Sequence, residues 1–132
     1  MLTGLARILF VAHGVVTAAA GIALIVVPGL VPAAVGIVLP PAAFLLSYLL
    51  GAIELAIAVL SIAATRVRDR STVRLIATVF VVMHVVTAAV EILAIAQGTS
   101  PVLWGNVALR VVVAALFLVV ARASVPAPRQ AD

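Results

Sequence analysis

The sequence contains no cysteine and no lysine, and only 9% of its 132 residues are charged. Without cysteine the chain has no disulfide, no thiol nucleophile and no thiolate metal ligand. A water-soluble domain carries roughly 25% charged residues, so the scarcity of charge excludes that class. What is present instead is a 67% share of hydrophobic residues. This composition predicts an integral membrane protein whose first partner is the lipid bilayer.

Acidic residues are also scarce. The chain has four acidic and eight basic residues, and all eight basic residues are arginine. The resulting pI of about 11.5 would suit a nucleic-acid-binding protein if the basic residues formed a run in a polar domain. They do not, so we expect no nucleic-acid partner. Arginine without lysine in a chain rich in alanine and valine is typical of a GC-rich genome.

Four apolar runs are each long enough for a transmembrane helix, which needs about 20 residues. We expect spans at 3–27, 42–64, 72–96 and 102–121. They form one domain, 1–121, followed by a polar tail, 122–132, that we expect to be disordered. The connection 28–41 holds four prolines and is too short to span. The predicted fold is all-α: an integral membrane, up-and-down four-helix bundle.

The arginines predict the orientation of this bundle. Arg7, the loop 66–74, Arg122 and Arg129 all fall on one side of the predicted spans. The other two connections contain no basic residue. Because cytoplasmic loops carry the excess of arginine, we expect both termini in the cytoplasm. The expected location is the bacterial cytoplasmic (inner) membrane.

Pairs of small residues four positions apart predict where helices approach each other. Gly14/Ala18 lies in the first span and Ala52/Ala56 in the second. Such spacing lets two helix backbones come close in a membrane. We expect these pairs at helix contacts, either within the chain or in a homo-oligomer.

One polar residue lies near the middle of each predicted span: His13, Glu54, His84 and Arg110. Counted from the arginine-rich side, these residues lie ten to thirteen positions inward. At about 1.5 Å per residue their depths differ by roughly 5 Å. A charge at mid-membrane needs a partner, so we expect a buried polar layer in which Glu54 and Arg110 form an ion pair.

Further polar residues fall on the same helix faces, one or two turns away. They extend the layer toward the charge-poor side and are the expected substrate-binding residues: Ser47, Thr17, Thr87, Glu91 and Asn106. The arginine-rich halves of the spans are almost purely apolar. A site built on this column therefore opens toward the charge-poor side or laterally.

Several chemistries fit such a layer. Histidine exchanges protons near neutral pH, and histidine with glutamate or arginine can bind the oxygens of a quinone, which predicts a quinone-linked redox site. His13 and His84 on parallel helices also suggest bis-histidine haem ligation. No ligand spacing predicts another metal site. The alternatives are a small proton- or solute-coupled transporter, or a structural or assembly subunit whose polar layer only fixes helix packing.

The sequence resembles the DoxX-like superfamily of small four-helix bacterial membrane proteins. The resemblance rests on an arginine in the first span, the Pro28-Gly29 exit, the basic loop, Asn106, and the motif Gly51-Ala52-Ile53-Glu54-Leu55. It implies a four-helix bundle, and for some members a link to thiosulfate:quinone oxidoreductase or other membrane oxidoreductase complexes. The resemblance implies that Glu54, which lies in this motif, is the residue most directly comparable with a functional position of the family. His13, His84 and Arg110 match no motif of the family.

Overall fold

The computed structural model describes residues 4–124, and in that range the chain is helical, as the sequence predicts. Four helices are long and apolar enough to cross a membrane: α1 (Gly4–Val26), α3 (Phe44–Ala64), α4 (Arg70–Ala96) and α5 (Leu103–Ala123). Their ends lie within two residues of the expected spans. The predicted tail begins inside α5, while residues 125–132, including Arg129, lie outside the described range.

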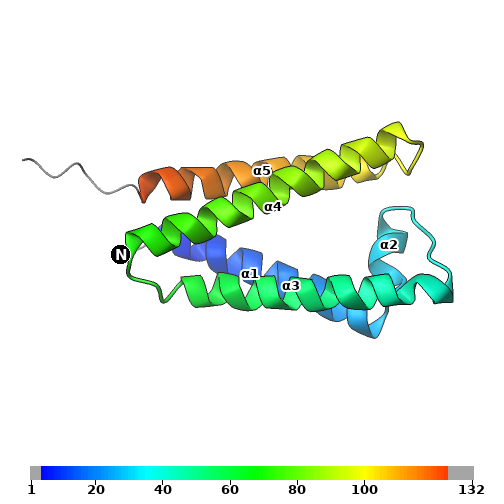
Figure 1. Ribbon diagram of the computed structural model, residues 1–132, viewed down its shortest axis with the longest axis horizontal. Helices are drawn as coiled ribbons and strands as arrows, with labels where there is room; N and C mark the ends of the chain where they lie inside the picture. The colour runs from blue at the N-terminus through cyan, green and yellow to red at the C-terminus, as the bar shows by residue number, and fades with distance from the viewer. Residues whose placement is uncertain (1–3, 125–132) are drawn as a thin grey trace, which may run out of the picture.

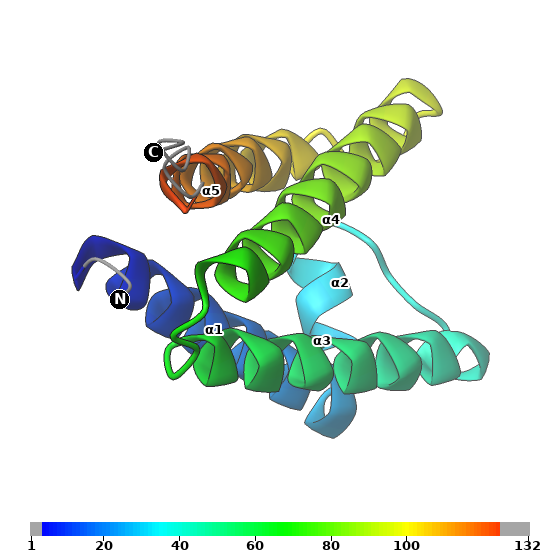
Figure 2. The same ribbon diagram turned by 60° about the vertical axis from the view of Figure 1, so that its left-hand side comes forward.

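The helices are arranged as two antiparallel pairs, α1 with α3 and α4 with α5 (Figures 1 and 2). The pairs lie close together where α3 turns into α4 and separate toward the opposite end (Figure 1). We call the first end, which carries the arginine-containing loop between α3 and α4, the basic end. The other end has no charged residue in its connections and is the neutral end.

The boundaries of α4 follow from its local sequence. Asp69 caps the start of the helix, and its carboxylate accepts hydrogen bonds from the backbone N–H and the hydroxyl of both Ser71 and Thr72, at 2.6–3.3 Å. These bonds hold the pKa of Asp69 below its ordinary range. At the other end Gly98 has φ +91°, and Thr99 N–H donates to the carbonyl of Ala94. A glycine with positive φ just past the last turn is a common way for a helix to end.

The connection between α1 and α3 contains a short helix, α2 (Leu30–Ala34), and a 3-10 turn, η1 (Pro41–Ala43). The sequence analysis expected an irregular proline-rich connection here and did not predict α2. Gly36 ends α2 with φ +79°, and a Cβ built on it would lie 2.5 Å from Ser100 Oγ. Because of this close approach, α2 and the turn between α4 and α5 meet at the neutral end.

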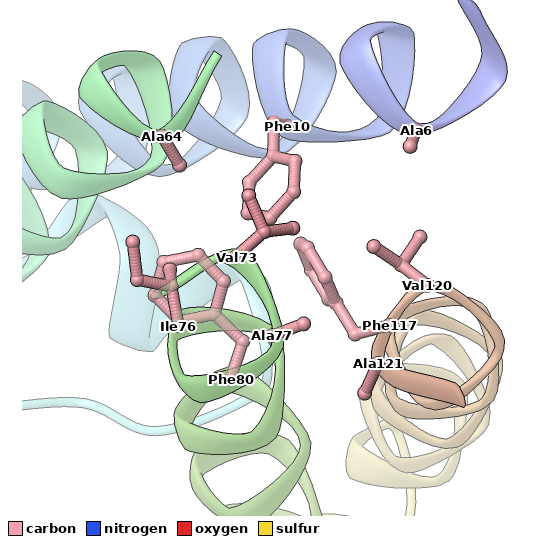
Figure 3. Close-up of a cluster of buried hydrophobic side chains, with 10 residues drawn as sticks. All are labelled: Ala6, Phe10, Ala64, Val73, Ile76, Ala77, Phe80, Phe117, Val120 and Ala121. Atoms are coloured by element: carbon pink, nitrogen blue, oxygen red, sulfur yellow. The ribbon is translucent and has the colours of Figure 1, made fainter. Parts of the chain in front are cut away.

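The main hydrophobic core lies in the basic half and joins all four long helices (Figure 3). Phe10 of α1, Phe80 of α4 and Phe117 of α5 are its largest members and are completely buried. Their ring centroids lie 5.0–6.1 Å apart, in tilted and edge-to-face geometries that are favourable for aromatic rings. These three rings, the phenylalanine cluster, hold the α4–α5 pair against α1.

Glycines set the distance between α1 and α3. A Cβ on Gly21 would lie 2.9 Å from the carbonyl oxygen of Gly51, and one on Gly51 would lie 2.8 Å from the carbonyl oxygen of Gly21. Gly14 is also buried in this contact, as predicted, but Ala52 and Ala56 are exposed. Ala52 and Ala56 thus form no helix contact within residues 4–124, because the face of α3 that meets α1 carries Gly51 and Ala58; their contact in a homo-oligomer stays a prediction.

Candidate functional site

Three side chains from three helices form a hydrogen-bonded chain between the helix pairs. His13 Nε2 of α1 lies 3.1 Å from His84 Nε2 of α4, and His13 Nδ1 lies 3.0 Å from Ser61 Oγ of α3. The Ser61 hydroxyl in turn donates to the carbonyl of Phe10 at 2.9 Å. All three side chains are buried. The sequence analysis placed His13 and His84 in one layer, and the structure brings them into direct contact.

The hydroxyl of Ser61 determines the protonation of both histidines. Its single proton goes to Phe10, so Ser61 Oγ accepts from His13 Nδ1–H. His13 Nε2 then carries a lone pair and accepts from His84 Nε2–H. The remaining ring nitrogen, His84 Nδ1, is therefore an acceptor. It is buried and has no hydrogen-bond partner among the described residues.

The phenylalanine cluster closes this chain toward the basic end. The ring of His13 lies 4.8 Å from that of Phe80 and 5.1 Å from that of Phe117, measured between centroids. The ring of His84 stacks on Phe117 at 6.4 Å. Each histidine is thus fixed in orientation by aromatic contact as well as by hydrogen bonding. The phenylalanine cluster therefore blocks access to His84 Nδ1 from the basic end, so a proton or ligand has to approach this atom from elsewhere.

A second polar cluster joins α4 to α5 nearer the neutral end. Glu91 Oε1 accepts from Arg110 Nε at 2.9 Å and from Asn106 Nδ2 at 2.6 Å. Both members of the ion pair are mostly shielded, with side chains 13% exposed for Glu91 and 22% for Arg110. Glu91 Oε2 is buried and has no partner in the range 4–124. This cluster neutralises Arg110 and leaves one unused carboxylate oxygen.

The expected ion pair between Glu54 and Arg110 is therefore not formed; Arg110 pairs with Glu91 instead. Glu54 is half-buried on α3 at the contact with Gly21 of α1, and Arg110 still exerts an electrostatic attraction on it. The predicted single layer is split into two clusters. The physical reason is the helix pairing, because α5 packs against α4 and gives Arg110 an acid on its own neighbour.

The remaining predicted binding residues fall into two groups. Asn106 belongs to the Glu91 cluster, and Thr17 is buried on the face of α1 that carries His13. Ser47 and Thr87 have their hydroxyls engaged by backbone: Ser47 donates to the carbonyl of Pro28 at 2.8 Å, and Thr87 to that of Met83 at 2.7 Å. Ser47 thus fixes the end of α1 rather than extending the polar column.

The two histidines do not fit bis-histidine haem ligation. Each metal–imidazole bond is roughly 2.0 Å long, so an ion between two imidazoles separates their nitrogens by about 4 Å. In this protein the two Nε2 atoms share a hydrogen bond at 3.1 Å. The space beside them is filled by Phe80 and Phe117. In residues 4–124 no three His, Asp or Glu side chains lie close enough together to hold a metal ion.

Sequence reasoning missed Ser61 and the phenylalanine cluster. A usable signal for Ser61 was present, because Ser47, Glu54 and Ser61 recur every seven residues and so share one face of α3. The three phenylalanines are ordinary in an apolar chain, and nothing in their spacing marks them as neighbours of the histidines.

The face of α4 between the two clusters carries both unpartnered acceptors. His84 and Glu91 are seven residues apart, which places them on one side of the helix and about 10 Å apart along its axis. Both atoms can only be satisfied by a group that donates a hydrogen bond. No protein-family model matches this chain, and no curated protein or solved structure matches it either.

Proposed function

We propose that this protein is a multi-pass subunit or accessory of a quinone-linked redox complex in the bacterial cytoplasmic membrane, with both termini in the cytoplasm. The observation that carries the proposal is the free acceptor at His84 Nδ1. A buried polar atom without a partner is costly, and a bound hydroxyl would satisfy it. The resemblance to the DoxX-like superfamily supports the same class of function.

The chemistry of the unpartnered atoms favours the reduced form of the carrier. His84 Nδ1 and Glu91 Oε2 both accept hydrogen bonds, whereas the carbonyl oxygens of a quinone can only accept. A quinol hydroxyl donates. On oxidation, a quinol releases two electrons, which pass to a redox partner protein, and two protons. In this proposal His84 Nδ1 accepts one of these protons and Glu91 Oε2 accepts the other, because both atoms have a lone pair without a hydrogen-bond partner among residues 4–124.

Protonation at His84 Nδ1 leaves every hydrogen bond of the chain intact. His84 would still donate from Nε2 to His13, which would still donate from Nδ1 to Ser61. A proton added to His13 Nε2 would instead face the N–H of His84 and break their bond. The chain therefore directs proton binding to one atom, a property that a purely structural network does not need.

The test is binding of decylubiquinol to the purified protein in lipid nanodiscs. His84→Leu removes the acceptor and should weaken binding roughly tenfold, the equivalent of about 1.4 kcal/mol or one hydrogen bond. Thr87→Val is the matched control on the same face, because its hydroxyl is already satisfied by Met83. Equal affinity in both variants, or no binding by the unmodified protein, would reject the proposal in favour of transport or assembly.

A further inference from the structure

The basic half of the molecule carries a groove of about 700 Å³ that the polar site does not use. One wall is α1 from Leu5 to Ala12 and the other is α5 from Leu116 to Ala123. The α3–α4 loop, with Arg68, and the first turn of α4, with Arg70, close the groove at the basic end. Its volume falls within the range of about 300–1000 Å³ typical of small-molecule sites.

The walls of this groove are apolar and open to the side. Leu5 is 81% exposed, and Ile8 and Val119 are each 65% exposed. These residues belong to helices long and apolar enough to span a membrane. In a bilayer such walls contact hydrocarbon, and a groove of this shape orders one or two acyl chains along α1 and α5.

The end of the groove carries two arginines that have no counter-charge within residues 4–124. Arg68 and Arg70 are exposed, and neither forms an ion pair with another described residue. Asp69 lies between them in sequence, but its carboxylate is engaged by Ser71 and Thr72. Two guanidinium groups at the end of an apolar groove match a phosphate joined to acyl chains.

We infer that this groove binds an anionic phospholipid, with its acyl chains between α1 and α5 and its phosphate on Arg68 and Arg70. Charge complementarity selects this occupant over a neutral lipid. A second copy of the chain would have to present an acidic group to the arginines, and among residues 4–124 the acid near the basic end is Asp69, which is already engaged by Ser71 and Thr72. The site is separate from the His84 face and does not depend on the proposed redox function.

The experiment is a titration of the full-length protein with phosphatidylglycerol or phosphatidylcholine, followed by native mass spectrometry. Surface attraction to anionic lipid is worth roughly a factor of five for each arginine. Arg68→Gln/Arg70→Gln should therefore weaken phosphatidylglycerol binding about 25-fold. Arg74→Gln/Arg122→Gln removes the same charge from exposed arginines outside the groove, so it measures the general surface attraction, and its effect should be clearly smaller because it removes no direct contact with the phosphate.

A second variant tests the apolar walls. Ala12 and Ala123 both line the groove and are exposed, so Ala12→Phe, or Ala123→Phe from the opposite wall, fills the space for the acyl chains. Either should reduce phosphatidylglycerol retention while all arginines remain. Equal binding of both lipids, equal effects of the two double variants, or a lipid-free dimer that Ala12→Phe disrupts would each overturn the inference.

Discussion

At the scale of single residues, the hydrogen bonds of Ser61 assign different tautomers to two histidines in contact. His13 carries its proton on Nδ1 and His84 on Nε2, because the Ser61 hydroxyl is already committed to Phe10. Nitrogen-15 NMR of histidine-labelled protein in nanodiscs distinguishes the two tautomers directly. We expect one signal set of each kind at neutral pH. Two Nε2–H histidines would contradict the assigned chain.

Removing the hydroxyl of Ser61 should abolish the fixed tautomer of His13. Ser61→Ala leaves His13 Nδ1–H without its acceptor, and the loss of one buried partner costs about 1–3 kcal/mol. We expect a lower unfolding midpoint in detergent and mixed tautomers at His13. Ser124→Ala is the control, because Ser124 is also buried but only donates to Val120 of its own helix. An equal effect of the two variants would show that Ser61 has no special role.

The two intramembrane acids should differ in their contribution to stability. Glu91→Gln leaves Arg110 without its counter-charge, and breaking a shielded ion pair by removing one partner costs on the order of 2 kcal/mol here, below the 3–5 kcal/mol of a fully buried pair. Glu54→Gln removes the same charge from a residue without an ion pair and should cost less. Chemical unfolding in mixed micelles measures both. A larger loss of stability in Glu54→Gln than in Glu91→Gln would instead support the Glu54–Arg110 ion pair predicted from the sequence.

These residues show what sequence reasoning can reach. The helices could be predicted to within two residues of their ends, because the bilayer demands long apolar runs. The start of α4, expected at residue 72, lies at Arg70, because Asp69 caps the helix. The shared depth of His13 and His84 could be predicted by counting residues from the helix ends, but their hydrogen bond could not. The partner of Arg110 could not, since depth does not say which helix faces which. Counting outward from the α4–α5 turn, where the register of two adjacent helices is fixed, places Glu91 opposite Asn106 and Arg110 and would have found the pair.

At the scale of helices, the approach of α1 to α3 depends on Gly21 and Gly51. Gly21→Ala places a methyl group 2.9 Å from the carbonyl oxygen of Gly51, so the two backbones must separate. Overpacking of this kind typically costs about 1–3 kcal/mol. Gly105→Ala is the matched control on α5, because nothing lies within 4 Å of its added Cβ. Equal thermal stability of the two variants in detergent would contradict the glycine contact.

The cap of α4 predicts how stability depends on pH. The hydroxyls and N–H groups of Ser71 and Thr72 depress the pKa of Asp69 in the folded protein. A depressed carboxyl pKa stabilises the fold above the unfolded-state pKa of about 3.9 and loses that effect as the pH falls below it. Asp69→Ala should therefore destabilise the protein at neutral pH, and its deficit should shrink in acid. A deficit that is constant from pH 7 to pH 3 would argue against the charged cap.

At the scale of the whole molecule, the uneven distribution of arginine predicts a single orientation in the membrane. Because the chain lacks cysteine, one introduced thiol can be labelled without background. Gln97→Cys lies at the neutral end, and a membrane-impermeant maleimide should label it in intact cells. Thr65→Cys lies at the basic end and should react only after the membrane is permeabilised. Labelling of Thr65→Cys in intact cells would contradict the predicted orientation and place the basic end, with the α3–α4 loop, outside the cytoplasm.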